Sequence, residues 1–443
     1  MNPDQLHGII FPILGNSRIM AITITVHVFF AFIAVGSFWI ALLAEYRGYR
    51  LNQPIYDRMA KGYMTFISQM VKINGVLGVA IIVLLISLFP IFSGWLYTIL
   101  FWALFGEVIF FMVLMISSIW YRQSWDKYQN RKPVHLAIGI GSAIAATMSA
   151  VLINAAQAFM LTPGKYFETK RLTDAVFNPT MVSSALHLLI PCILNAAAGY
   201  AIYAYILSER KPADREYYNI TGAYNARIAA WGILLQPLAG LYFLWTVYQA
   251  NHPAFQNIIS GLASPFFWTM AALGSIAFLL SIIYLLLGWV RGKTLFLALA
   301  VLVFLAFPFG AYNRERARKP YLIYGQMYMS QQPVITIPVI KPIETTASIS
   351  STTTAAAPVI TEKPKPLNTK SGKTIISEHG CQSCHVIKGQ GGSFGPELKS
   401  MNKKFDGDKE KLKKFLVSPP GSMPPFSGSP EDLDSLADYL LKL

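Results

Sequence analysis

Eight long apolar segments decide what this chain can fold into. They lie at about 19–45, 66–90, 95–120, 134–160, 180–207, 226–249, 265–290 and 294–312. Each is long enough to cross a bilayer as a helix, which takes about 20 mainly apolar residues. Because a helix satisfies its own backbone hydrogen bonds, it is the structure that such segments adopt in lipid. The sequence therefore predicts an all-α fold, a polytopic transmembrane bundle of about eight helices.

The composition agrees with a membrane protein that carries a soluble appendage. Of the 443 residues, 54% are hydrophobic and only 13% are charged. The net charge of +15 would suit a nucleic-acid partner in a soluble protein. In a membrane protein, Lys and Arg mainly report topology instead. We therefore expect contact with membrane lipid and no nucleic acid.

Basic residues mark one side of the predicted bundle. The connectors after the first, third, fifth and seventh segments carry Arg47, Arg50, Arg58, Lys61; Arg122, Lys127, Arg131, Lys132; Arg210, Lys211, Arg215; and Arg291, Lys293. The connectors after the second and sixth carry no Lys or Arg, whereas the one after the fourth carries Lys165, Lys170 and Arg171. By the positive-inside rule the first set is cytoplasmic, so both chain ends lie outside. This predicts a multi-pass protein of the cytoplasmic (inner) membrane.

The run Cys381-Gln382-Ser383-Cys384-His385 is the most specific chemical signal in the chain. A C-x-x-C-H run is the attachment site of a c-type haem. The two thiols add to the haem vinyl groups, and the adjacent His becomes the proximal iron ligand. A thioredoxin-like redox pair fits poorly, because no βαβ pattern surrounds the cysteines and the His follows directly. The motif predicts one covalent haem c, held by Cys381, Cys384 and His385.

The residues after this motif resemble a small class I cytochrome c. Gly395-Pro396 and Gly421-Ser422-Met423-Pro424-Pro425 carry the resemblance, which implies Met423 as the distal iron ligand. A closing helix is expected at about 430–443, with apolar Leu433, Leu436, Ala437, Leu440 and Leu441 on one face. Haem c is attached outside the cytoplasm, so the domain is expected on the periplasmic or extracytoplasmic side. This agrees with the charge pattern.

Three domains follow from these patterns. Residues 1–330 form the transmembrane haem-binding domain, 331–368 a linker, and 369–443 the small α-helical cytochrome c domain. The linker is rich in Pro, Thr, Ser and Ala, which predicts disorder. A flexible chain of this length has a root-mean-square reach of roughly 35 Å.

A lysine-rich run in the last domain has two possible explanations. It consists of Lys399, Lys403, Lys404, Lys409, Lys411, Lys413 and Lys414. It could be a solvated helix face, or a docking patch for an acidic redox partner outside the cytoplasm.

Four membrane-domain side chains are candidate metal ligands: His27, His187, Met270 and Glu315. A lone His or Met in an apolar helix more often serves packing, yet ionisable groups inside a span are costly and usually functional. Counted from the outer helix ends at 1.5 Å per residue, all four fall within ~12 Å of the outer face. Haem groups would have to lie in that layer to exchange electrons with an external haem c.

Over about residues 10–330 the chain resembles subunit I of cytochrome bd quinol oxidases. The resemblance rests on Arg18 and His27, Lys72-Ile73-Asn74-Gly75-Val76-Leu77-Gly78-Val79, Gly141-Ser142, Ser149-Ala150, Ala155 to Pro163, Phe177-Asn178-Pro179 with His187, Phe267-Trp268-Thr269-Met270, and Glu315 with Arg318-Lys319-Pro320-Tyr321. These matches occur in order and at suitable spacing.

The resemblance implies a set of cofactors and ligands. His187 and Met270 would hold a low-spin haem b, whereas His27 and Glu315 would each ligate a separate high-spin haem. Glu107 would be a third-helix carboxylate that supplies protons, so Glu107, Glu315 and His27 form the expected catalytic set. One to three haem b groups are implied, of which one could be haem d. A second membrane subunit resembling cytochrome bd subunit II is also implied.

The departures from the family pattern concern quinol and protons. Only about residues 249–264 replace the family's long quinol-binding loop, and Glu107 stands without the second third-helix carboxylate. Gln157 replaces a fourth-helix Asn of the proton route, Tyr321 replaces the signature Trp, and Ala317 replaces its Gly. The ninth helix is absent. The haem ligands are thus retained, while the quinol site and the proton route differ.

Two enzymatic functions remain open, and a purely structural role does not suit the haem c domain. In the first, a respiratory, oxidase-like complex takes electrons through haem c and reduces oxygen or another small molecule at the membrane haems. In the alternative, quinol is oxidised at the membrane haems and haem c passes the electrons outward. Both make the chain an oxidoreductase within a multi-subunit complex.

Overall fold

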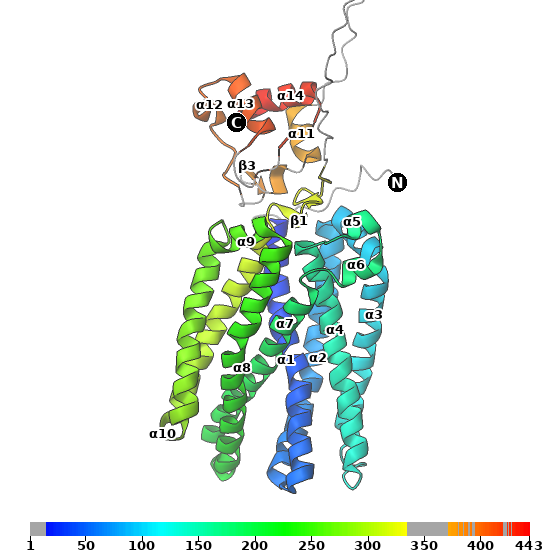
Figure 1. Cartoon of the computed structure of the whole chain (residues 1–443), viewed down its shortest axis with the longest axis vertical. Coiled ribbons are helices and arrows are strands. Elements are labelled where there is room, and N and C mark those ends of the chain that lie inside the picture. Colours follow the sequence, from blue (N-terminus) through cyan, green and yellow to red (C-terminus); the bar gives the residue numbers. More distant parts are fainter. Residues whose placement is uncertain are drawn as a thin grey trace, which may run out of the picture. The chain divides into compact units, whose positions relative to one another are not determined.

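The computed structural model describes residues 15–334, 371–379, 381–383, 385–388, 390–391, 395–419, 423, 425–426 and 428–443, and the side chains of all of these except 288–291, 383 and 390–391. Most of the predicted linker, 335–368, and Cys384 lie outside the described residues. Contacts divide the chain into two units, Met1–Tyr324 and Gly325–Leu443 (Figure 1).

Long helices form the first unit. They are α1 (Asn16–Leu51), α2 (Pro54–Leu88), α3 (Pro90–Gln123), α4 (Lys132–Leu161), α7 (Met181–Arg210), α8 (Arg215–Ala250) and α10 (Ser264–Ala317). They contain eight candidate membrane spans among the described residues, because α10 holds two, Ser264–Leu287 and Gly292–Ala317. The predicted polytopic bundle of about eight helices is confirmed.

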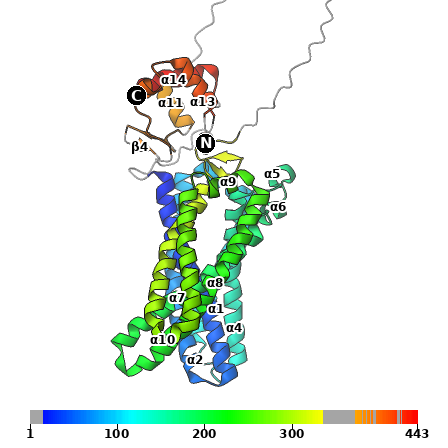
Figure 2. The ribbon, with the colours of Figure 1, turned by 60° about the vertical axis from the view of Figure 1, so that its left-hand side comes forward.

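Short elements connect the long helices. They are α5 (Tyr166–Thr169), α6 (Leu172–Val176), the 3₁₀ turn η2 (Pro212–Asp214), α9 (His252–Ile259) and strand β1 (Tyr321–Ile323). Figures 1 and 2 show α5, α6 and α9 at the same end of the bundle, opposite the end with the connectors after α1, α3 and α7. The second set of connectors carries most of the basic connector residues, whereas Lys165, Lys170 and Arg171 lie beside α5 and α6.

The helices extend beyond the predicted apolar segments. The first segment was expected to end near 45, yet α1 continues through Arg47 and Arg50 to Leu51. Similarly, α8 begins at Arg215 rather than near 226. The apolar pattern ends where lipid ends, whereas Arg, Lys and Glu are good helix formers that continue a helix into water. Pro54 and Pro90 begin α2 and α3, where their missing N–H groups need no partner.

The two spans of α10 lie side by side. The rings of Phe266 and Tyr312 are 4.5 Å apart, although 46 positions separate them in the chain. A straight helix would hold them roughly 70 Å apart at 1.5 Å per residue. The chain must therefore reverse between the spans, as expected for separate seventh and eighth membrane helices.

Small residues let the helices approach closely. Gly36 of α1 lies against the backbone of Cys192 in α7, where a Cβ atom would have no room. A Cβ atom on Gly222 of α8 would lie 2.5 Å from the Tyr205 ring of α7. Close approach at small residues is how helices associate in lipid, which offers no hydrophobic driving force between them.

The second unit contains a small helical domain. Its elements are β2 (Met327–Tyr328), α11 (Gly372–Glu378), the 3₁₀ turn η3 (Cys381–Ser383), β3 (Val386–Ile387), β4 (Gln390–Gly391), α12 (Met401–Lys404), α13 (Lys409–Val417) and α14 (Pro430–Leu440). Leu436, Ala437 and Leu440 of α14 are buried in its core, so the predicted closing helix is confirmed. Gly372 permits α11 to cross α14 at Tyr439, since a Cβ atom there would lie 2.7 Å from the Ser435 carbonyl oxygen.

Candidate functional site

His385 is held in the state that an iron ligand requires. Its Nδ1 lies 2.7 Å from the carbonyl oxygen of Pro396. A carbonyl can only accept a hydrogen bond, so Nδ1 carries the proton and Nε2 presents its lone pair. Burial lowers the pKa of His385, which favours the neutral imidazole. The ring thus fits the proximal position of a c-type haem.

The surroundings of His385 fit the same group. Gly395 lies against the imidazole ring, where a Cβ atom would collide with it. Cys381 and Met423 both pack at the edge of the domain core. A thiol, an imidazole and a thioether within this one small domain match the donors of a covalently attached haem. Cys384 lies outside the described residues, and Met423 as the distal ligand stays a prediction.

Three candidate haem ligands of the membrane domain each lie against a glycine of a neighbouring span. They are His27, His187 and Met270. A Cβ atom on Gly78 of α2 would lie 3.4 Å from His27 Cε1, and one on Gly240 of α8 would lie 3.5 Å from His187 Cε1. For Gly310 the corresponding distance to Met270 Sδ is 3.0 Å. These glycines let the neighbouring helix backbone approach each of the three side chains closely.

His27 has a free ring nitrogen in an apolar setting. Its ring hydrogen-bonds to the backbone of Asn74, while its buried Nδ1 has no partner among the described residues. Leaving a buried polar atom unsatisfied costs about 1–3 kcal/mol. A bound iron would remove this penalty, so His27 fits the predicted ligand role.

His187 has a partner that the sequence did not reveal. Gln236 of α8 places Nε2 2.9 Å from His187 Nδ1, and Gln236 Oε1 is buried without a partner in the described part of the chain. If the amide turns over, Oε1 accepts a hydrogen bond from Nδ1–H and the Nε2 lone pair is left for a metal. Phe243 stacks on the imidazole at 5.7 Å. A polar residue inside an apolar span was the available signal for Gln236.

His187 and Met270 face different helices. His187 faces α8, whereas Met270 faces the second span of α10. No hydrogen bond or ring contact joins the two side chains in the described residues. Their joint role in holding one low-spin haem stays a prediction.

The two carboxylates of the expected catalytic set lie in different surroundings. Glu107 of α3 accepts a 2.7 Å hydrogen bond from Ser149 of α4. Glu315 ends α10 and pairs with Arg318 Nη2 at 2.6 Å and Lys319 Nζ at 2.7 Å. Two cations keep the Glu315 carboxylate ionised, and each of its oxygens has a further lone pair for a metal. Sequence reasoning did not assign these partners.

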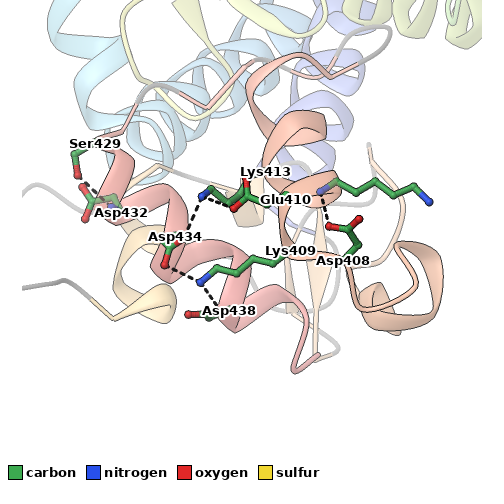
Figure 3. Close-up of polar contacts among 9 residues, drawn as sticks. Asp408, Lys409, Glu410, Lys413, Ser429, Asp432, Asp434 and Asp438 are labelled. Carbon is green, nitrogen blue, oxygen red and sulfur yellow. Dashed lines mark hydrogen bonds and ion pairs between the residues drawn. The ribbon is translucent and has the colours of Figure 1, made fainter.

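The lysine-rich run is largely neutralised within its own domain. Four of its members form ion pairs: Lys399 with Glu397, Lys409 with Asp434 and Asp438, Lys411 with Asp406, and Lys413 with Glu410 and Asp434. Figure 3 shows Lys409 and Lys413 of α13 reaching Asp434 of α14. Local pairing favours the solvated helix face over a docking patch.

Comparisons with known proteins divide the chain in the same way. The family model for cytochrome bd terminal oxidase subunit I matches residues 17–252, and the model for cytochrome c oxidase, cbb3-type, subunit III matches residues 368–440. The solved bd oxidase from Geobacillus thermodenitrificans has a similar fold, with a TM-score of 0.61 and 20% sequence identity over 70% of this chain and 88% of that chain. No curated protein matches the sequence. The first family model covers more than half of the chain.

Proposed function

Because this chain belongs to the family of cytochrome bd terminal oxidase subunit I, we propose that it takes electrons from an external donor through its own cytochrome c domain and serves the reduction of oxygen. The chain is a haem-based respiratory oxidoreductase subunit. One observation carries the proposal. A single chain carries donors for haem c and also a candidate residue for every membrane haem ligand. When bound, the haems would supply the redox centres that carry electrons towards oxygen.

The chain's own side chains bind and orient the cofactors. His385 and Met423 would bind the iron of haem c, with the Pro396 carbonyl fixing the imidazole tautomer. In the membrane, Gln236 orients His187. Glu107 would hold and release a proton beside the Ser149 hydroxyl. These roles are orientation, charge control and proton handling.

The short connection between α8 and α10 supports electron entry through the cytochrome c domain. Asn251 Nδ2 donates to the carbonyl of Leu161, and Asn257 Nδ2 donates to the carbonyls of Arg316 and Ala317. These bonds tie α9 to the ends of α4 and α10. A tied eight-residue helix offers far less room than a long loop for enclosing a quinol. An external protein donor does not need such a loop.

One observation favours the alternative, in which quinol is oxidised and electrons leave through haem c. Glu107 makes its hydrogen bond to Ser149 without a second α3 carboxylate nearby in sequence. Oxygen reduction consumes protons, whereas outward electron transfer from quinol releases them. A weak proton supply would therefore harm the first function more.

The complex is proposed to lie in the cytoplasmic (inner) membrane with a second subunit resembling cytochrome bd subunit II. The eight spans among the described residues, an even number, would put residues 15 and 324 on one side of the membrane. The basic connectors lie at the opposite end and would face the cytoplasm. The cytochrome c domain would then meet a redox partner outside the cytoplasm.

Oxygen uptake by the purified complex tests the proposal. Reduced soluble cytochrome c as the donor should drive steady uptake that carbon monoxide inhibits, and His385→Ala should abolish it. Uptake driven by quinol alone would refute entry through haem c. Reduction of soluble cytochrome c by quinol, without oxygen uptake, would establish the alternative.

A further inference from the structure

Two tyrosines and an arginine meet where α7, α8 and the first span of α10 pack together. Tyr205 belongs to α7, Arg227 to α8 and Tyr284 to α10. Tyr205 lies five positions before the end of α7, so the group is near the end of the bundle that carries the basic connectors. Both tyrosines are buried, whereas Arg227 is exposed. None of the three is a predicted haem ligand.

Aromatic packing holds the two phenols together. The ring of Phe296, from the second span of α10, lies 6.1 Å from the Tyr205 ring and 5.9 Å from the Tyr284 ring. The close approach of α8 at Gly222 presses against the Tyr205 ring from another side. The hydroxyls of Tyr205 and Tyr284 are hydrogen-bonded to each other. The two phenols are therefore fixed side by side among three helices.

The group has more hydrogen-bond donors than its own acceptors use. Two phenols carry two O–H groups, and the bond between them uses one. Within the described residues, the structure gives the remaining O–H no acceptor. Arg227 adds a guanidinium, which only donates, and it interacts electrostatically with both hydroxyls. Donors of this kind fit the oxygens of an anion.

The carboxylate closest to this group in the chain already has partners. Glu209, one turn beyond Tyr205 on α7, pairs with Lys293 Nζ at 2.6 Å and lies 3.8 Å from Arg215. Lys293 also lies over the Tyr205 ring at 5.9 Å. Together with Arg227, the described side chains of this junction comprise three cations and one carboxylate. The positive balance attracts an anion.

Arg227 lies inside the lipid-crossing part of α8. It is 12 positions from the helix start at Arg215, which is about 18 Å along the axis. Because the Cα–Cβ bonds of a helix tilt towards its N-terminus, the side chain of Arg227 leans back towards the basic connectors. A long basic side chain can thereby reach the headgroup layer from within a span. One turn further in, Trp231 is 58% exposed and offers an apolar surface to an acyl chain.

A phospholipid suits this surface better than a soluble anion does. Exposed Ile283 and Leu287 lie next to Tyr284 and one turn beyond it on α10, so apolar surface borders the polar groups. The basic connectors would put the site in the cytoplasmic leaflet, which carries anionic lipids. Basic pockets between membrane helices on that side are where anionic headgroups bind.

We propose that Arg227, Tyr205 and Tyr284 bind the phosphate of an anionic phospholipid at the basic-connector end of the bundle. Arg227 donates charge-assisted hydrogen bonds to the phosphate oxygens, and the remaining phenol O–H donates one more. The acyl chains lie over Trp231 and Ile283. The bound lipid joins α7, α8 and α10 at one place. The inference goes beyond the proposed function, because it does not depend on which redox reaction the protein performs.

Native mass spectrometry of the delipidated, intact complex tests the site. Phosphatidylglycerol, which is anionic, and phosphatidylcholine, which is zwitterionic, are titrated separately, and the bound lipids are counted. The wild type should hold one phosphatidylglycerol at least tenfold more tightly than any phosphatidylcholine. Arg227→Gln should lose this one lipid, and Tyr284→Phe should bind it at least threefold more weakly. Arg227→Lys keeps the charge and should retain the lipid with lower affinity.

Arg122→Gln is the matched control. Arg122 is an exposed arginine of α3 in a basic connector, without a carboxylate partner among the described residues. Its loss should leave the lipid count at the wild-type value, and all variants should keep the wild-type haem content, which shows that the fold persists.

Three outcomes would overturn the proposal. The first is a wild-type lipid count in Arg227→Gln. The second is an equal loss in Arg122→Gln, because general positive charge would then explain the binding. The third is displacement of phosphatidylglycerol by millimolar inorganic phosphate, which would identify a site for a free anion instead of a lipid.

Discussion

Predicted ligands lie beside glycines throughout this molecule. His27, His187 and Met270 each face a glycine across a helix contact, and His385 faces Gly395. A glycine at such a place removes the Cβ atom that would otherwise occupy the space next to the donor. The arrangement links the sequence, which places glycines in otherwise apolar spans, to close packing of the candidate ligands against neighbouring helices.

The distal ligand of haem c gives the first residue-scale prediction. Met423→His should lower the midpoint potential of haem c, because Met/His ligation favours ferrous iron and His/His ligation does not. The drop should be a substantial part of the about 0.8 V range that axial ligands span. Redox titration followed by the haem c absorption measures it. Met401→Leu, another core methionine, should leave the potential unchanged, and an unchanged potential in Met423→His would exclude Met423 as the ligand.

The expected low-spin haem b gives the second residue-scale prediction. His187→Ala should remove one b-type absorption band and leave haem c intact. Gln236→Leu should keep that band but shift its midpoint potential, because the imidazole loses the partner that orients it. The exposed His252 provides the control, since His252→Ala should change neither property. Persistence of all b-type bands in His187→Ala would disprove the assignment.

Residue types were easier to predict than residue pairs. The haem c donors follow from a local motif, and the membrane ligands follow from a resemblance in which order and spacing suffice. Gln236, in contrast, is 49 positions from His187, and Tyr205 is 79 positions from Tyr284. Such pairs depend on which helix faces touch, which an apolar pattern around a helix does not specify.

At the scale of elements, hydropathy predicted the spans but not the helix lengths. Charged residues continue α1 and α8 beyond the lipid-crossing part, so the apolar pattern marks lipid and not the helix end. The short helix α9 was expected only as a short connector. Its start was nonetheless visible in Asn251-His252-Pro253, an N-cap residue followed by a proline in the first turn, and Asn251 does accept from the Ala254 N–H.

The contact between α13 and α14 gives a prediction about pH. Lys409, and then Lys413, lower the pKa of Asp434. A carboxylate with a lowered folded-state pKa stabilises the fold above its unfolded pKa of about 3.9, and this contribution is lost as pH falls through the folded value. Asp434→Asn should therefore lower the melting temperature of the haem c domain at pH 7 by a few degrees at most, because exposed ion pairs contribute little. At a pH below the lowered pKa of Asp434 the two proteins should melt together.

Haem c absorption during heating of the full-length protein measures that difference. Lys403 makes no ion pair within the described residues, so Lys403→Gln should melt like the wild type at both pH values. A difference between wild type and Asp434→Asn that persists undiminished at low pH would show that the ion pairs are not its cause.

At the scale of the whole molecule, two independent sequence signals give the same topology. The basic connectors predict which side is cytoplasmic, and the haem c motif predicts export of the last domain. The eight spans among the described residues make the two predictions compatible. The division into two units, at Tyr324–Gly325, lies close to the predicted end of the membrane domain at 330.

Whether the molecule reduces a small gas depends on an open iron position, and this gives the last prediction. His27 and Glu315 would each ligate a separate high-spin haem. His27 offers one buried nitrogen without a partner among the described residues, and Glu315 lies between two cations. If each is the one protein ligand of its haem iron, a position on that iron would be left for a gas. The reduced protein should therefore bind carbon monoxide at a membrane haem.

His27→Ala should weaken that binding at least tenfold, while His252→Ala should not, as measured by the carbon monoxide difference spectrum of the intact complex. A wild-type spectrum without any carbon monoxide signal would mean that every haem is six-coordinate, and the molecule would then be a conductor of electrons rather than an oxidase.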